Sequence, residues 1–193
     1  GSLVDLRSIG INGEPSVLDS LRAGVDVVTY SGDKLLGGPQ SGIISGRPDL
    51  VARMRSNSLF RALRVDKLTY AALEATLLAY IKQDHDTIPS LRMMRLSKDS
   101  IRHRAQHLQS KLSATNLATE LIDGESIIGG GAAPSATLPT TLLAITHRSL
   151  SASELSGALR NSQPPIIARV EDARVLLDLR TVLPDQDDSL LAS

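Results

Sequence analysis

The sequence predicts an α/β protein built from two domains, residues 1–85 and 86–193. Three observations lead to this prediction. In the first half, β-rich runs at 25–30 and 41–45 alternate with helical patterns. Residues 83–89 are polar and end in a proline, which is typical of a boundary. In the second half, short strand candidates surround a helix, which is typical of a small α+β domain with an antiparallel sheet.

The first predicted domain begins with a short helix, 16–23, that Gly24 ends. Residues 25–30 then predict a buried strand, and 41–45 predict a second strand across a glycine loop. These strands are expected to lie like a hairpin beside a larger sheet.

Two helices complete this domain. Pro48 opens a helix that runs to Arg55, and a second helix covers about 66–82. The second helix has an apolar stripe that we expect to pack against another element. The stripe consists of Leu68, Ala71, Ala72, Ala75, Leu78 and Ala79.

The second predicted domain begins with one long helix from Ser90 to about Thr115. Its expected buried side consists of Leu91, Met94, Ile101, Ala105, Leu108 and Leu112. Strand candidates follow at 121–122, 126–128 and 141–145.

The rest of this domain has clear local signals. Residues 153–160 predict a helix capped by Ser151 or Ser153. Residues 166–170 and 175–179 predict a hairpin with its turn at 171–173. The acidic residues 185–188 are expected to cap a final short helix.

Composition limits the possible functions. The chain has 21 basic and 21 acidic residues, which argues against a dedicated nucleic-acid-binding module. It has no cysteine, so disulfides, thiol catalysis and thiolate metal sites are excluded. No apolar run could span a bilayer, and the first residues do not have the pattern of a signal peptide. We therefore expect a soluble cytoplasmic protein that makes no membrane contact.

The most informative segment is Ser-Gly-Asp-Lys-Leu-Leu-Gly-Gly-Pro-Gln, residues 31–40. It places Lys34 directly after a predicted strand and before a glycine-rich loop. A lysine that forms a Schiff base needs a fixed backbone and a partly desolvated amine. The glycines would let the backbone approach a bulky ligand or a neighbouring subunit. Composition and spacing alone favour the alternative, in which Lys34 is a solvated surface lysine before an ordinary turn.

A second segment is rich in arginine. Six cations and two acids lie between Arg47 and Lys67. Arg61 and Arg64 are three residues apart and would share a face if that stretch were helical. Guanidinium groups suit bidentate binding of phosphate-like anions. The alternative is a solvated basic helix face.

Other candidate sites have weaker support in the sequence. His103 and His107 have a helical spacing that can hold a metal, but two arginines flank His103 and would repel a cation. Gly129 to Gly131 read as a flexible turn rather than a phosphate loop. No serine has a nucleophile-elbow pattern around it.

Taken together, these segments resemble the bacterial selenocysteine synthases, the L-seryl-tRNA(Sec) selenium transferases. Residues 25–46 are similar to the family's cofactor-lysine segment, and residues 59–67 and 71–77 are similar to the block that follows it in the family. The resemblance also covers the opening residues 1–6 and the closing segments 165–172 and 177–182.

The resemblance implies a fold. The family has fold type I (aspartate-aminotransferase-like), in which a large α/β domain binds pyridoxal 5′-phosphate and a small C-terminal domain follows. Residues 1–85 would then be the end of the large domain, and 86–193 would be the small domain. Family members are more than twice as long, so we expect this chain to be a fragment that is inactive alone, with the tRNA contacts upstream of it.

The resemblance also implies a reaction. Lys34 would hold pyridoxal phosphate through a Schiff base and act as a base at the α-carbon of the seryl group of seryl-tRNA(Sec). Asp33 would orient Lys34 or assist proton transfer, although a structural role in the turn is also open. Arg61 and Arg64 would hold selenophosphate, the selenium donor.

Two alternatives remain at this stage. One is a related pyridoxal-phosphate lyase that acts on a small amino acid or amino sugar. The other is a non-catalytic fragment that contributes to the homo-oligomer in which the family's enzymes assemble.

Overall fold

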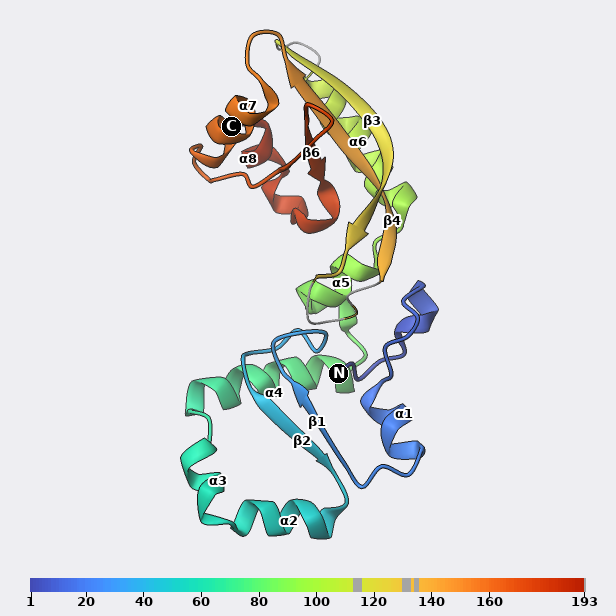
Figure 1. Ribbon diagram of the computed structural model, residues 1–193, viewed down its shortest axis with the longest axis vertical. Coiled ribbons are helices and arrows are strands. Elements are labelled where there is room, and N and C mark those ends of the chain that lie inside the picture. Colours follow the sequence, from blue (N-terminus) through green and yellow to red (C-terminus); the bar gives the residue numbers. More distant parts are fainter. Residues whose placement is uncertain (113–115, 130–132, 134–135, 193) are drawn as a thin grey trace. The chain divides into compact units, whose positions relative to one another are not determined.

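The computed structural model describes residues 1–112, 116–129, 133 and 136–192, and the chain forms two compact units. Unit 1 comprises residues 1–95 and 127–136, and unit 2 comprises residues 96–126 and 137–193. Each unit combines helices with one β-sheet (Figure 1), so the predicted α/β class is confirmed. The assignment of 1–85 and 86–193 to separate functional domains stays a prediction.

The elements of unit 1 precede residue 96. In chain order they are η1 (Leu6–Ile9), α1 (Val17–Arg22), β1 (Val27–Ser31), β2 (Gly42–Gly46), α2 (Pro48–Ser56), α3 (Ser58–Leu63), α4 (Lys67–Ile81), η2 (His85–Thr87) and α5 (Pro89–Arg95).

The two strands of unit 1 pair antiparallel, with Val27 opposite Gly46 and Ser31 opposite Gly42. The predicted pairing is therefore confirmed. The prediction that the first strand is buried is wrong, because every residue of β1 is half-buried or exposed. A two-stranded sheet has little surface of its own to bury, and no third strand joins this sheet in the described part of the chain.

Helix α4 begins where predicted. The Asp66 carboxylate accepts a hydrogen bond from the Thr69 N–H at 2.8 Å, and this interaction holds the pKa of Asp66 below its usual value. The stripe predicted to be buried is mostly exposed, and Leu68 retains 83 % of its accessible surface. A helix that is apolar around its circumference is normally buried. Within the described residues, α4 instead presents an uncovered apolar surface.

The long helix predicted from Ser90 is two helices, α5 and α6 (Lys98–Leu112). Ser97 separates them because its hydroxyl accepts a hydrogen bond from the Ser100 N–H at 3.1 Å and so begins a new helix. The predicted apolar side is confirmed over most of its length, although Leu112 is only partly buried. The expected end of the helix, at Thr115, lies outside the described residues.

Unit 2 consists of α6 and the elements that follow it. These are β3 (Leu117–Ile127), whose last residue belongs to unit 1, β4 (Thr137–His147), α7 (Ala152–Arg160), β5 (Arg169–Glu171), β6 (Arg174–Asp178), η3 (Leu179–Thr181), η4 (Pro184–Gln186) and α8 (Asp187–Ala192).

The sheet of unit 2 has the order β3-β4-β6-β5. The predicted hairpin is confirmed: Arg169 lies opposite Leu176, and the turn residues Asp172 and Ala173 have φ values of 49° and 57°. Such a pair of positive φ angles matches the right-handed twist of the strands. The candidates at 121–122 and 126–128 were predicted as separate strands. They lie in and just beyond one strand, β3, because Asp123 to Glu125 continue the extended backbone between them.

The predicted start of helix α7 is confirmed with Ser151 as its cap. The Ser151 hydroxyl accepts a hydrogen bond from the Glu154 N–H, and the Glu154 carboxylate accepts one from the Ser151 N–H. The hydrogen bonds that the Glu154 carboxylate accepts from the Ser151 hydroxyl and from the Ser151 N–H lower the pKa of Glu154. The predicted final helix is present as α8.

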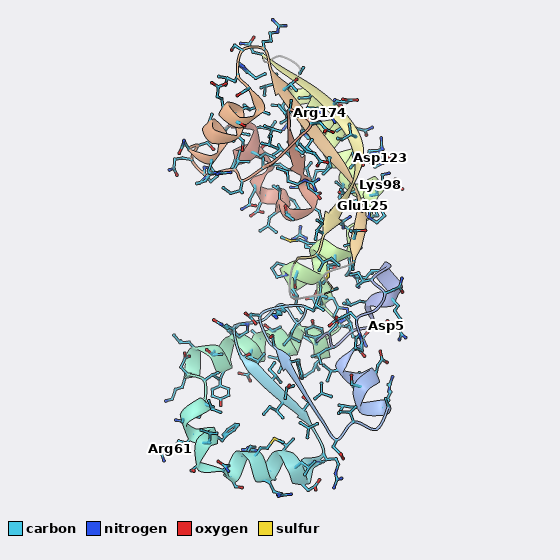
Figure 2. The ribbon with its side chains drawn as sticks, in the orientation of Figure 1. Asp5, Arg61, Lys98, Asp123, Glu125 and Arg174 are labelled. Atoms are coloured by element: carbon cyan, nitrogen blue, oxygen red, sulfur yellow. The ribbon has the colours of Figure 1, made fainter. Side chains whose placement is uncertain are left out.

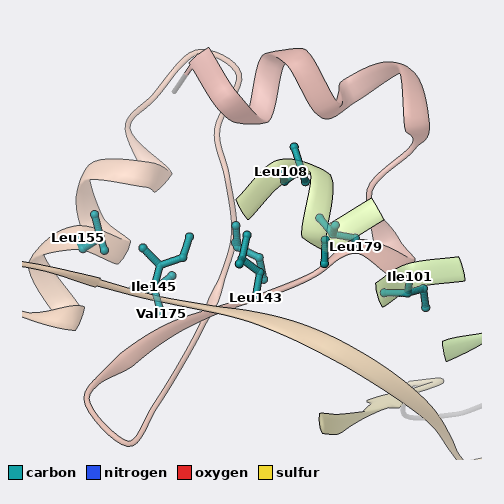
Figure 3. Close-up of a cluster of buried hydrophobic side chains, with 9 residues drawn as sticks. Ile101, Leu108, Leu143, Ile145, Leu155, Val175 and Leu179 are labelled. Carbon is teal, nitrogen blue, oxygen red and sulfur yellow. The ribbon is translucent and has the colours of Figure 1, made fainter. Parts of the chain in front are cut away.

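The core of unit 2 lies between α6, α7 and the sheet (Figure 3). Its fully buried members come from helix, sheet and the segment after β6. They are Ile101, Ala105, Leu108, Leu143, Ile145, Leu155, Val175, Leu177 and Leu179.

Candidate functional site

A tight turn at the end of β1 carries Asp33 and Lys34. The Gly32 N–H donates to the Ser41 carbonyl oxygen at 2.8 Å, and the Gly38 N–H donates to the Gly32 carbonyl oxygen at 2.8 Å. The Lys34 carbonyl oxygen accepts a third hydrogen bond, from the Gly37 N–H at 2.9 Å. These bonds supply the fixed backbone that a Schiff-base lysine requires.

Two buried leucines anchor this turn from beneath. Leu35 and Leu36 keep 2 % and 0 % of their accessible surface. The Tyr80 hydroxyl of α4 donates a hydrogen bond to the Leu36 carbonyl oxygen at 3.0 Å. Burial raises the pKa of Tyr80 to about 12, which keeps the hydroxyl protonated as a donor. The turn is thereby tied to α4.

Glycine is required at two positions of the turn because the chain packs against itself there. A Cβ atom at Gly32 would lie 2.5 Å from the Pro39 carbonyl oxygen. Gly37 has a φ of 73°, and a Cβ there would lie 2.5 Å from Cγ2 of Ile88. In the described structure, therefore, these two glycines admit the chain's own atoms rather than a ligand or a second subunit.

The side chains of Asp33 and Lys34 are both exposed. Within the described part of the chain, neither side chain has a hydrogen-bond or ion-pair partner. The partial desolvation that a Schiff-base lysine needs is therefore not supplied by the residues that surround Lys34 here.

Four arginines, which we call the arginine cluster, lie on α2, on α3 and at the residue after α3: Arg53, Arg55, Arg61 and Arg64. All four are exposed, and none has an ion-pair partner among the residues described. Figure 2 shows Arg61 projecting outward from α3. The nearby acids are already engaged: Asp49 pairs with Arg47 at 2.9 Å, and Asp66 caps α4. The cluster is thus an uncompensated positive surface.

The condition that would place Arg61 and Arg64 on one helix face is not met. Arg61 lies in the last turn of α3, whereas Arg64 is the residue after the helix, with φ −64° and ψ 130°. That backbone is extended, so the spacing of side chains in a helix does not apply to Arg64.

Lys34 and helix α2 lie at opposite ends of the β1–β2 pair (Figure 1). The turn joins the end of β1 to the start of β2, while α2 follows the end of β2. No hydrogen bond or ion pair of the described residues links Lys34 to the arginine cluster.

One feature of unit 1 was not predicted from the sequence. A cleft of about 680 Å³ lies between β2, α2 and α3. Its lining includes Ile44, Leu50, Arg53, Met54, Asn57, Leu59, Phe60 and Leu63. The spacing of Leu50 and Met54, and of Leu59 and Leu63, is four residues, which indicates one apolar face on each helix. This pattern indicates the two apolar faces, but not that a cleft lies between them.

The histidine pair lies in unit 2, on α6. Its neighbours are engaged: Arg102 pairs with Asp123 at 2.6 Å, and Arg104 binds Asp187. The described residues contain no group of three or more His, Asp or Glu side chains that could hold a metal ion. Nor do they include a helix that is long and apolar enough to cross a membrane. Of the predicted glycine turn, Gly130 and Gly131 lie outside the described residues.

Comparison with known proteins identifies relatives along almost the whole chain. The family model described as L-seryl-tRNA selenium transferase matches residues 1–183. The L-seryl-tRNA(Sec) selenium transferase of Carboxydothermus hydrogenoformans is 48 % identical over 191 residues, covering 97 % of this chain and 41 % of that protein. The enzyme of the same name from Geobacter sulfurreducens is 44 % identical over 200 residues, covering 100 % of this chain and 43 % of that protein. The chain thus spans about two fifths of the length of these curated relatives.

Proposed function

The chain belongs to the L-seryl-tRNA selenium transferase family, and from this premise we propose that it forms part of a pyridoxal-phosphate-dependent enzyme. The reaction would convert seryl-tRNA(Sec) to selenocysteinyl-tRNA(Sec) with selenophosphate as the selenium donor. Because the curated relatives are more than twice as long, the complete active site would belong to a longer polypeptide. The observation that carries the proposal is the turn at Lys34, whose backbone is held by hydrogen bonds while its amine stays accessible.

The residues of this turn fit a covalently held aldehyde cofactor. The Lys34 amine is exposed and has no partner in the described structure, so it is available to a carbonyl group. When bound, pyridoxal phosphate supplies an electron sink for the negative charge that develops at the substrate α-carbon. The missing desolvation of Lys34 would come from a surface outside the described residues.

The remaining roles belong to side chains of unit 1. The Lys34 amine would remove the proton from the α-carbon of the seryl group, and Asp33, its neighbour, would orient it or assist that transfer. Arg61 and Arg64 would bind the anionic selenophosphate, because their guanidinium groups have no acid to neutralise them among the described residues. The names of the relatives support a selenium transferase over a lyase for small amino acids or amino sugars.

We also propose a homo-oligomer. The turn that carries Lys34 joins β1 to β2, and α2 follows the other end of β2, so the arginines of α2 and α3 would serve the Lys34 of a second copy. The exposed apolar surface of α4 supports such an assembly, because large apolar patches mark interaction surfaces. We also propose that residues 1–85 end a fold-type I large domain, that 86–193 form the small domain, and that the enzyme is cytoplasmic.

The test is chemical attachment at Lys34. Adding pyridoxal phosphate to the 193-residue chain, reducing with borohydride and measuring intact mass should give one adduct, mapped to Lys34. The Lys34→Ala variant should lose it. Lys67→Ala, which removes another exposed lysine of the same unit, should keep it. Adducts scattered over several lysines, unchanged by Lys34→Ala, would mean that the 193-residue chain has no working pocket; the same result in the longer polypeptide would contradict the assignment of Lys34.

A further inference from the structure

The cleft between β2, α2 and α3 combines apolar walls with a cation. Its walls are apolar and exposed: Leu59 keeps 62 % and Leu63 keeps 70 % of its accessible surface. Its rim carries the Arg53 guanidinium, which has no ion-pair partner within the described residues. Its size falls in the range of small-ligand sites.

Two further residues of the lining, Phe60 and Asn57, have side chains that can bind a flat heterocyclic ring. Phe60 is half-buried in the cleft and is the only phenylalanine of the chain. The Asn57 side-chain oxygen is used locally, because it accepts the Leu59 N–H at 2.9 Å. The amide nitrogen of Asn57 has no partner among the described residues and stays available as a donor.

An aromatic ring, apolar walls, an amide donor and a cation together suit a nucleotide. Unstacked bases bind on aromatic side chains and are read at their edges by hydrogen bonds, while arginine binds the phosphate. A protein surface of purely apolar character would leave Arg53 unpaired and partly desolvated, which is unfavourable. A second copy docked face to face would bring the same arginines against each other.

We propose that this cleft binds the 3′-terminal adenosine of the aminoacylated tRNA, with Phe60 against the base and Arg53 on the adjoining phosphate. The inference rests on the proposed function. The serine is esterified to that adenosine, so its subsite must adjoin the group that holds the selenium donor. Helix α3 provides both, since Phe60 faces the cleft and the next residue, Arg61, projects outward.

The probe is the trinucleotide CpCpA with a 5′ fluorescent label, and the measurement is its anisotropy on titration with the 193-residue chain. Loss of one base–aromatic contact should weaken binding about tenfold in Phe60→Ala. Phe60→Leu, which keeps the apolar volume and protects the fold, should weaken it similarly. Arg53→Gln should lower affinity and reduce the slope of log affinity against log salt by about 0.7. Arg55→Gln is the matched control, because Arg55 is exposed on the same helix and does not line the cleft.

The expected pattern also includes weaker binding of CpCpC than of CpCpA. Equal binding of the two trinucleotides, no binding by the unmodified chain, or equal effects of Arg53→Gln and Arg55→Gln would overturn the inference. So would a Phe60→Leu variant that dissociates an oligomer without changing trinucleotide affinity, because the cleft would then be a contact between copies. The Lys34 adduct is measured without any nucleotide, so failure here leaves that test of the proposed function intact.

Discussion

Arg180 of unit 2 and the arginine cluster of unit 1 have opposite environments. In unit 2, Arg180 keeps only 4 % of its accessible surface and donates to the Ser126 hydroxyl at 2.8 Å and to the carbonyl oxygens of Leu96 and Pro139, each at 2.7 Å. In unit 1, the arginine cluster is exposed and has no ion-pair partner in the described structure. An arginine whose hydrogen-bond partners lie within the protein stabilises the fold. An arginine without such partners is available to bind a ligand.

The acid beside Arg180 also has its hydrogen-bond partners within unit 2. The Asp178 carboxylate accepts hydrogen bonds from the hydroxyls of Ser126 and Thr140, at 2.5 and 3.0 Å, and from the Arg180 N–H at 3.0 Å. Burial lowers the pKa of Arg180, and the charge of Asp178 opposes that shift. Arg104 is held similarly, by Asp187 and the carbonyl oxygens of Leu179, Val182 and Leu183. The fold of unit 2 therefore satisfies Arg104 and Arg180, whereas the arginine cluster of unit 1 has no ion-pair partner among the described residues.

The largest effect on stability is expected at Arg180. Arg180→Met should destabilise unit 2 by about 3 kcal/mol, because it removes the charge that faces the half-buried Asp178 carboxylate and leaves the carbonyl oxygens of Leu96 and Pro139 without their donor. All three tyrosines, Tyr30, Tyr70 and Tyr80, lie in unit 1. Hydrogen exchange of β4 and β6 amides should therefore accelerate while the tyrosine fluorescence transition in urea stays unchanged. A loss below about 1 kcal/mol would mean that the network is dispensable.

A smaller effect on stability is expected at Tyr80, which joins α4 to the turn in unit 1. Tyr80→Phe should lower the free energy of unfolding by about 1 kcal/mol, since it removes the hydrogen bond to the Leu36 carbonyl oxygen. Tyrosine fluorescence and circular dichroism during urea unfolding would measure it.

The same residue predicts a dependence on pH. The pKa of Tyr80 is about 12 in the folded chain and 10.0 ordinarily. As pH rises from about 10 to about 12, the unfolded chain holds fewer protons than the folded chain, so the free energy of unfolding falls over this window. Below about pH 10 the contribution of Tyr80 is fully present. Tyr80→Phe should remove this contribution to the alkaline loss. An unchanged alkaline profile would indicate that the phenol is not held neutral by burial.

The smallest effect on stability is expected in the arginine cluster. Arg61→Gln combined with Arg64→Gln should change the free energy of unfolding by less than about 0.5 kcal/mol, because neither side chain has a folded-state partner in the described structure. In the longer polypeptide proposed above, the same pair should impair selenophosphate use and leave the reducible Lys34 adduct intact. Loss of the adduct would show that the two arginines support the lysine itself.

Local chemistry could be read directly from the sequence. The caps at Ser16, Asp66 and Ser151 were predictable because each side chain bonds a backbone group within three residues. The hairpin at 169–178 was predictable because a two-residue turn sets its register. The Lys34 segment was recognisable by resemblance, but its role and those of Asp33, Arg61 and Arg64 stay predictions.

Other features depend on contacts that sequence patterns do not contain. Ser97 divides α5 from α6, and the Leu96 carbonyl oxygen beside it binds Arg180, which is 84 residues away. The stripe on α4 has the pattern of a buried face, yet a pattern cannot tell whether a partner is present.

The sequence by itself determined the element types, most helix starts, the antiparallel hairpins and the family, because these depend on neighbouring residues and on motif order. Only the tertiary structure decided which cations are buried and which are free, and that a cleft lies beside the arginine cluster. The buried cations depend on contacts between segments far apart in the chain, and the cleft depends on how β2, α2 and α3 pack, so neither is set by local preference.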